Sequence, residues 1–180
     1  INVRFLISQL LDPKLKNNFG RYVFQCFLAA FAILVVILLE QILFNNQGLG
    51  QPVVIAAIGS TAVVLFILPS SRPAKARNTL GGHFLAMAIG AILTIGSSVD
   101  PMVSLATGIE WEFALRSSAA VGLTIFVMAG TNSEHPPAAG TALAMVVQRF
   151  DWGLAIFLIT SILTLFLIHR IMRKYLKDLY

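Results

Sequence analysis

Six long apolar runs constrain the fold of this 180-residue chain more than any other feature. The hydrocarbon core of a bilayer is about 30 Å thick, so a spanning helix needs roughly 20 mostly apolar residues. The runs are continuous rather than alternating, which favours helices over the strands of a barrel. The sequence therefore predicts an all-α membrane protein with about six transmembrane segments. The runs cover residues 22–39, 53–68, 81–98, 113–129, 138–147 and 152–168. The fifth is short and is either a half-helix or a re-entrant segment.

The composition excludes several other classes of protein. Hydrophobic residues make up 57% of the chain and charged residues only 12%, against about 25% charged in an ordinary soluble domain. This balance rules out disorder and argues against a soluble enzyme. The net charge of +5 does not indicate a nucleic-acid partner, because the bases stand at the ends of apolar runs. With Cys26 alone there is no disulfide or CxxC pair, and we expect neither metal nor cofactor.

The placement of the basic residues predicts the topology. Bases cluster before the first run, between the second and third runs, and after the last run. With six segments and both termini cytoplasmic, nearly all of them lie inside, whereas five segments would split the terminal clusters between the two sides. We expect an integral protein of a bacterial inner membrane, with one domain over residues 1–180. Residues 1–19 are predicted to form an amphipathic interfacial arm, with a solvated cytoplasmic arm as the alternative.

An internal repeat is predicted between residues 56–90 and 119–147. At constant offset, seven residues between Ala56 and Pro73 recur between Ala119 and Pro136, and the GxxLAM pattern from Gly82 recurs from Gly140. Each unit is a small-residue segment, a Pro-containing turn and a second helix, so the repeats are parallel. Transporters often bind substrate at such a repeat interface. The small residues either allow close helix packing or line a narrow pathway with the hydroxyls of Ser60, Thr61, Ser117 and Thr124.

The two Pro-containing turns hold the most unusual chemistry. Pro136 and Pro137 suit the first turn of a helix, whose N-terminus favours anions. Asn132, Ser133 or Glu134 is expected to cap that helix. The other turn carries three bases before a Gly-Gly-His sequence; these residues are Arg72, Lys75, Arg77, Gly81, Gly82 and His83. Facing each other, the turns would form an anion site that also includes His135. Alternatively, the bases only orient the loop and the histidines only fix the packing.

Three segments resemble the HPP family of integral membrane proteins, named for His-Pro-Pro. They are IGSTAVVLFILPSS (58–71), RNTLGGH (77–83) and EHPPAAGTAL (134–143). The resemblance implies a single transmembrane HPP domain. Family descriptions often count four spans, from which the six predicted here depart. The resemblance also implies transport, because some related members in plastids and cyanobacteria are implicated in nitrite transport. Six residues are assigned a structural part in the motif: Gly81, Gly82, Glu134, Pro136, Pro137 and Gly140.

These features predict a transporter or channel for a small inorganic anion, with nitrite as the leading candidate, that forms a homo-oligomer. The predicted pathway or binding residues are Ser60, Thr61, Arg72, Lys75, Arg77, His83, Arg116, Thr124, Asn132 and His135. Arg116 is assigned to the outer mouth, with pairing to Glu110 or Glu112 as the alternative. Glu134 is expected to pair with a base of the facing turn. We expect no enzyme, because no HExxH, GxSxG or P-loop motif is present. A membrane anchor or sensing module for a cytoplasmic partner is the main alternative, and an intramembrane enzyme is a weaker one.

Overall fold

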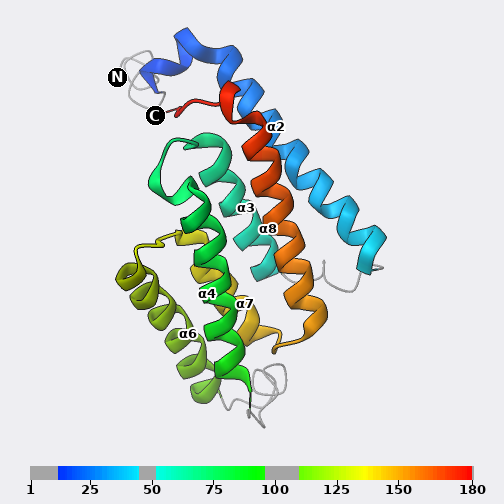
Figure 1. Ribbon diagram of the computed structural model, residues 1–180, viewed down its shortest axis with the longest axis vertical. Helices are drawn as coiled ribbons and strands as arrows, with labels where there is room; N and C mark the ends of the chain where they lie inside the picture. The colour runs from blue at the N-terminus through cyan, green and yellow to red at the C-terminus, as the bar shows by residue number, and fades with distance from the viewer. Residues whose placement is uncertain (1–11, 45–51, 96–109, 180) are drawn as a thin grey trace, which may run out of the picture.

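The computed structural model describes residues 12–44, 52–95 and 110–179, and these parts consist of helices joined by short turns (Figure 1). Six α-helices and two short 3₁₀ helices fall within the described ranges. The α-helices are α2 (Pro13–Phe44), α3 (Pro52–Ile67), α4 (Ala76–Thr94), α6 (Glu110–Thr131), α7 (Pro136–Val147) and α8 (Trp152–Met172). The 3₁₀ helices are η1 (Arg72–Ala74) and η2 (Arg173–Tyr175). The prediction of an all-α membrane protein is confirmed.

The helices match the six apolar runs, and their lengths differ in an informative way. Among the described residues, α2, α6 and α8 provide stretches long and apolar enough to cross a membrane. Helix α7 has 12 residues, about 18 Å at 1.5 Å per residue, which is well short of a bilayer core of about 30 Å. The short fifth segment is therefore confirmed. Most of the predicted arm at 1–19 lies outside the described residues; α2 begins at Pro13 and has a non-helical residue at Asn18.

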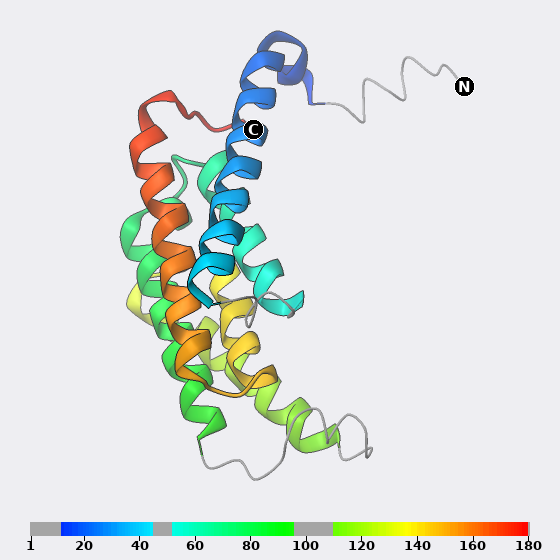
Figure 2. The same cartoon turned by 90° about the vertical axis from the view of Figure 1, so that its right-hand side faces the viewer.

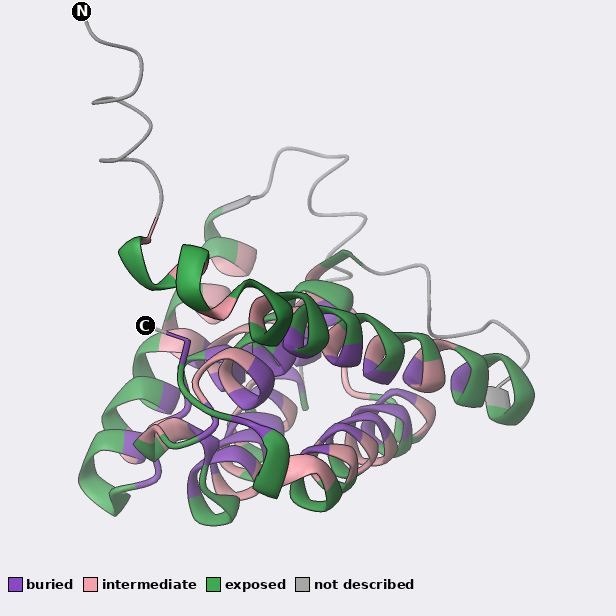
Figure 3. Cartoon of the chain, turned by 90° about the horizontal axis from the view of Figure 1, so that it is seen from above, coloured by how far each residue is buried: buried purple, intermediate pink, exposed green. Residues whose placement is uncertain are grey.

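Helix α7 lies at the centre of one half of the bundle, where it packs against α3, α4 and α6. Helix α2 packs against α3 and α8 on the other side, as two perpendicular views show (Figures 1 and 2). An apolar cluster lies in each half, alongside buried polar residues, and many large apolar side chains are exposed on the outside. Figure 3 shows that the buried positions lie along the inner sides of the helices and the exposed positions on their outer sides. Phe27 and Phe126, for example, are 71% and 75% exposed. An outward face of this kind suits lipid rather than water.

Small residues bring α4 and α7 into close contact. A Cβ at Gly90 would lie 2.5 Å from the Cβ of Met145 and 2.8 Å from the carbonyl oxygen of Ala142. Only glycine fits so close to a neighbouring backbone, which is the use of small residues expected inside membranes. Gly59 and Gly122 have no such neighbour within 4 Å, so close packing does not explain every glycine in the runs.

The two ends of the described chain meet at one end of the bundle (Figure 1). The buried amide of Gln25 on α2 donates to the carbonyl oxygens of Phe66 and Lys177 and accepts the N–H of Lys177. The N–H of Leu179 donates to the carbonyl oxygen of Ile67, 3.1 Å away. The C-terminal segment thus ties α2 to the end of α3.

The predicted repeat units coincide with two helix–turn–helix pairs, α3–α4 and α6–α7. Their turns, 68–75 and 132–135, hold the Pro-containing segments identified in the sequence. The duplication itself stays a prediction.

Candidate functional site

The structure brings His83 and His135 together inside the bundle. His83 lies seven positions after the first residue of α4, in its third turn, and His135 directly precedes α7. Their ring centroids are 4.9 Å apart, with an angle of 58° between the planes. His83 is 1% exposed and His135 is fully buried. Two histidines that lie 52 positions apart in the chain therefore form one site.

Two threonines complete what we call the histidine–threonine cluster: Thr61, His83, His135 and Thr141. The hydroxyl oxygen of Thr61 on α3 lies 2.9 Å from Nε2 of His83 and 3.4 Å from Nε2 of His135. The hydroxyl of Thr141 on α7 lies 2.8 Å from Nδ1 of His83. All four residues are buried, and they connect α3, α4, α7 and the turn before α7.

The hydrogen bonds of the cluster fix the tautomer of His135 but not that of His83. Nδ1 of His135 lies 2.9 Å from the carbonyl oxygen of Pro73. A carbonyl only accepts, so in a neutral ring Nδ1 carries the hydrogen and Nε2 accepts. Thr61 has one hydroxyl hydrogen, which either the carbonyl oxygen of Ala57 or Nε2 of His135 can accept, whereas Nε2 of His83 accepts from or donates to this hydroxyl according to its tautomer. The cluster can therefore reorganise its hydrogen bonds without a buried formal charge.

Glycine at position 82 lets the His-Pro-Pro turn rest on α4. A Cβ there would lie 2.9 Å from the Cβ of His135 and 3.1 Å from the carbonyl oxygen of Ser133. At Gly140 a Cβ would approach the Cβ of Ala57 at 3.2 Å, whereas at Gly81 the nearest atom is 3.8 Å away. Among the predicted structural glycines, Gly82 therefore has the tightest link to the site.

Polar contacts also join the two turns at their exposed rim. The guanidinium of Arg72 lies 3.6 Å from the Glu134 carboxylate, with both side chains about half exposed. Arg72 is therefore the base of the facing turn that pairs with Glu134, as predicted. Arg77 donates to the carbonyl oxygen of Thr131 at 2.7 Å, and Asn78 donates to that of Glu134 at 3.1 Å. Lys75 is exposed on the same rim.

The start of α7 differs from the sequence prediction. Its N-cap is His135, whose side chain makes no capping bond, so the caps expected from Asn132, Ser133 or Glu134 are wrong. The reason is that the turn is used otherwise: Ser133 bonds to the Thr131 hydroxyl, and Asn132 is exposed with a left-handed φ of 60°. Pro136 and Pro137 have no N–H, and that of Ala138 donates to the carbonyl oxygen of His135. The first turn of α7 therefore offers few backbone donors to an anion.

Other predicted residues lie away from the cluster. Arg116 contacts Glu112 at 2.6 Å and the carbonyl oxygen of Leu93 at 2.7 Å, so the alternative of pairing with a nearby acid is what the structure shows. Ser60 is exposed and lines an apolar groove of about 840 Å³ between α3 and α7, together with Pro136 and Pro137. Thr124 is buried on α6, and its hydroxyl has no partner among the described residues.

Thr141 and the carbonyl of Pro73 belong to the site but were not predicted. The repeat contained a signal for Thr141. When Gly82 is aligned with Gly140, Thr141 takes the position in the second unit that His83 has in the first. Nothing in the sequence indicated the carbonyl of Pro73, since every residue carries one. Within the described ranges, no group of three His, Cys, Asp or Glu side chains is placed to hold a metal ion.

Comparisons with known proteins agree with the motifs. The model of the HPP transmembrane region matches residues 14–178. A transmembrane protein of Dictyostelium discoideum is 31% identical over 137 residues, which cover 71% of this chain and 45% of that protein. A second transmembrane protein of the same organism is 30% identical over 129 residues, covering 67% of this chain and 39% of its own length.

The chain thus spans less than half the length of these relatives. No solved structure matches it. The family match covers nearly the whole chain and includes both turns and all four residues of the histidine–threonine cluster. This protein is therefore an integral membrane protein of the HPP family.

Proposed function

We propose that this HPP domain moves a small inorganic anion across the membrane, as a transporter or a channel, with nitrite as the first candidate. The observation that carries the proposal is the meeting of His83 and His135 at Thr61 inside an apolar bundle. Buried polar groups in membrane domains are costly and usually functional. Imidazole N–H and hydroxyl groups can bind a small anion without a fixed charge in the membrane.

The charges at the rim of the two turns support an anion as the substrate. Arg72, Lys75 and Arg77 are exposed there and give this end of the bundle a positive potential. The acid closest to the cluster is Glu134, whose charge would oppose an anion. Its contact with Arg72 offsets that charge, although an exposed ion pair of this kind contributes little to stability.

We further propose that both termini are cytoplasmic, in a bacterial inner membrane, and that the protein is a homo-oligomer. The ends of the described part of the chain, at residues 12 and 179, lie at one end of the bundle (Figure 1), and the basic residues of 12–21, 72–77 and 170–177 belong to the segments at or near that end. Positive residues favour the cytoplasmic side. A small bundle with extensive exposed apolar faces is suited to association with further copies.

Two alternatives make different predictions. For an intramembrane enzyme, a histidine base is usually oriented by a carboxylate. Both histidines here are instead bonded to threonine hydroxyls or the carbonyl of Pro73, which supports a protein that is not an enzyme. A membrane anchor or sensing module would use the exposed bases of the rim. Capture of a cytoplasmic partner that is lost on neutralising Arg72, Lys75 and Arg77 would favour this second alternative.

The test is nitrite influx into liposomes that contain the purified protein, with nitrate, formate and chloride as competitors. In the variant His135→Asn, the amide can still donate to the carbonyl of Pro73, but no atom replaces the Nε2 that faces Thr61. We expect the nitrite flux to fall about tenfold or more. A tenfold fall needs a rise of only about 1.4 kcal/mol in the free-energy barrier to transport. His135→Ala should lose the flux as well.

The matched control is His169→Met. His169 is also buried, but it lies on α8 and neither ring nitrogen has a hydrogen-bond partner among the described residues. This variant should keep the flux of the wild type. Folded protein that moves none of the four anions would overturn the proposal. Equal flux in His135→Asn and the wild type would remove the cluster from the pathway.

A further inference from the structure

With both of its rings neutral, the histidine–threonine cluster has one hydrogen fewer than its hydrogen bonds need. Five hydrogen-bonding distances join its four side chains to one another and to the carbonyl oxygens of Ala57 and Pro73. Each neutral imidazole and each threonine hydroxyl supplies one hydrogen. Four hydrogens therefore serve five positions, and one acceptor is left without a donor.

The position without a hydrogen is Nε2 of His135. Four of the five distances are 2.8 to 2.9 Å. The four hydrogens fill all of these when Thr141 donates to Nδ1 of His83, Nε2 of His83 donates to Thr61, and Thr61 donates to its own helix. Only the pair at 3.4 Å, Thr61 and Nε2 of His135, then lacks a hydrogen. A proton added to this nitrogen turns it into a donor and completes the network.

That proton brings a positive charge, and the helices that meet at the cluster hold no acid to neutralise it. Helices α3 and α7 contain no ionisable residue. On α6, Arg116 bonds to Glu112 and to the carbonyl oxygen of Leu93. Leu93 lies ten positions after His83, which is about 15 Å along α4. Glu110, the remaining ionisable residue of α6, is the first residue of that helix and precedes both.

The ionisable groups at the rim of the two turns are in contact with water. Lys75 and Arg77 are exposed and basic. Glu134 precedes His135 in the chain, but its carboxylate lies 3.6 Å from the guanidinium of Arg72, and both side chains are about half exposed. Solvent and Arg72 therefore offset the charge of this acid outside the cluster.

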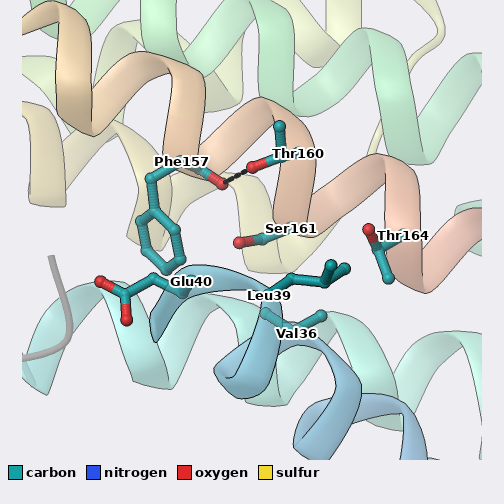
Figure 4. Close-up of a pocket in the computed structure, with 7 residues that line it drawn as sticks. All are labelled: Val36, Leu39, Glu40, Phe157, Thr160, Ser161 and Thr164. Carbon is teal, nitrogen blue, oxygen red and sulfur yellow. Dashed lines mark hydrogen bonds between the residues drawn. The ribbon is translucent and has the colours of Figure 1, made fainter. Parts of the chain in front are cut away.

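The ionisable groups of α8 and the buried acid of α2 lie in other surroundings. The ring of His169 packs against Phe66 and Phe166, with centroids 6.4 and 5.9 Å apart. Asp151 caps the start of α8. Glu40 lines a pocket formed by residues of α2 and α8, and Figure 4 shows its carboxylate directed away from the hydroxyls of α8. A charge at the cluster thus has no counter-ion within the described part of the protein.

We propose that the cluster binds its anion together with one proton, so that the protein carries the pair as an electroneutral symport. A buried charge is costly unless it is paired, so the proton at Nε2 of His135 strengthens the binding of the anion, and the anion strengthens that of the proton equally. Without this proton, every hydrogen is already donated inside the cluster and the anion finds no free donor. The inference rests on the anion transport proposed above and adds its second substrate.

Linked binding can be measured on the purified full chain in detergent. Sodium nitrite is added to lightly buffered protein while an indicator dye follows the pH, and sodium gluconate at equal ionic strength corrects for the salt. We expect proton uptake with the nitrite. The apparent dissociation constant should fall about tenfold for each unit by which the pH falls, as linkage requires for one proton. Nitrite binding without proton uptake, and with a constant independent of pH, overturns the proposal.

Variants locate the proton. His135→Asn keeps a donor for the carbonyl of Pro73 but has no titratable nitrogen facing Thr61. This variant should take up no proton with nitrite, whereas the control His169→Met should behave as the wild type. Melting temperatures show whether both are folded, and the wild-type measurement decides the linkage even where a variant does not fold. Wild-type proton uptake by folded His135→Asn would overturn the assignment of the proton to His135.

Electroneutrality is measured in the liposomes used for nitrite influx. Uptake should follow an inward proton gradient and ignore a potassium diffusion potential set with valinomycin. Protein-free liposomes give the rate at which nitrous acid crosses the lipid unassisted, and only the excess over this rate is counted.

The outcomes separate this inference from the transport proposal. Excess uptake that follows the potential and ignores the proton gradient overturns the symport and supports transport of the anion alone. Linked binding without excess uptake overturns transport but supports the shared site for anion and proton. Absence of both binding and uptake in folded protein overturns both.

Discussion

Thr61 makes more contacts in the site than any other single hydroxyl. It lies within hydrogen-bond distance of both histidines and of its own helix at Ala57. Thr61→Val keeps the shape but removes the hydroxyl, which leaves a buried ring nitrogen on each histidine without this partner. We expect a loss of about 1 to 2 kcal/mol in the free energy of unfolding, at the upper end of what membrane hydrogen bonds contribute. The measurement is thermal unfolding in detergent.

Thr124 provides the matched control, because it is equally buried and occupies the corresponding position of the predicted repeat. Its hydroxyl has no partner among the described residues. Thr124→Val should therefore change the stability little or raise it, and Thr61→Ser should retain most of the wild-type stability. Equal losses in the two valine variants would show that the cluster contributes nothing beyond ordinary packing.

At the scale of the helix, contact between α4 and α7 depends on Gly90. A methyl group there would meet the Cβ of Met145 and the backbone oxygen of Ala142, at 2.5 and 2.8 Å. Because the backbone cannot yield easily, Gly90→Ala should cost about 1 to 3 kcal/mol in stability. Gly122→Ala, with open space around its Cβ, should gain up to about 1 kcal/mol from helix propensity. A chemical unfolding series compares the two, and a stable Gly90→Ala would mean that the helices are less close than described.

Helices were predictable from the sequence because each depends on local composition. Apolar run length identified all six segments and the short α7, and the prolines located its start. The cap of α7 was not predictable in the same way. Asn132, Ser133 and Glu134 are all suitable caps by residue type. Contacts of the turn with α4 nevertheless place His135 at the N-cap position of α7. Side-chain direction depends on these long-range contacts, which a local pattern does not contain.

At the scale of the whole molecule, the sequence predicted which residues would come together. It did not predict all the contacts that hold them there. Facing turns led to the expected pairing of Glu134 with a base and to a site containing both histidines. The backbone acceptor at Pro73 was missed, and so was the contact of the C-terminal segment with α2. Such contacts use groups that every residue has, or pair residues more than 150 positions apart. They emerge only when the elements are assembled.

Gln25 is the residue that holds this assembly at the ends of the chain. Gln25→Leu would remove three hydrogen bonds, to the carbonyl oxygens of Phe66 and Lys177 and from the N–H of Lys177. We expect a lower melting temperature and faster digestion of the C-terminal segment by carboxypeptidase. In the control Gln148→Leu, the lost amide nitrogen has no hydrogen-bond partner among the described residues, so digestion should be unchanged. Equal digestion of both variants would mean that Gln25 does not secure the C-terminal segment, because of these two glutamines only Gln25 bonds to it.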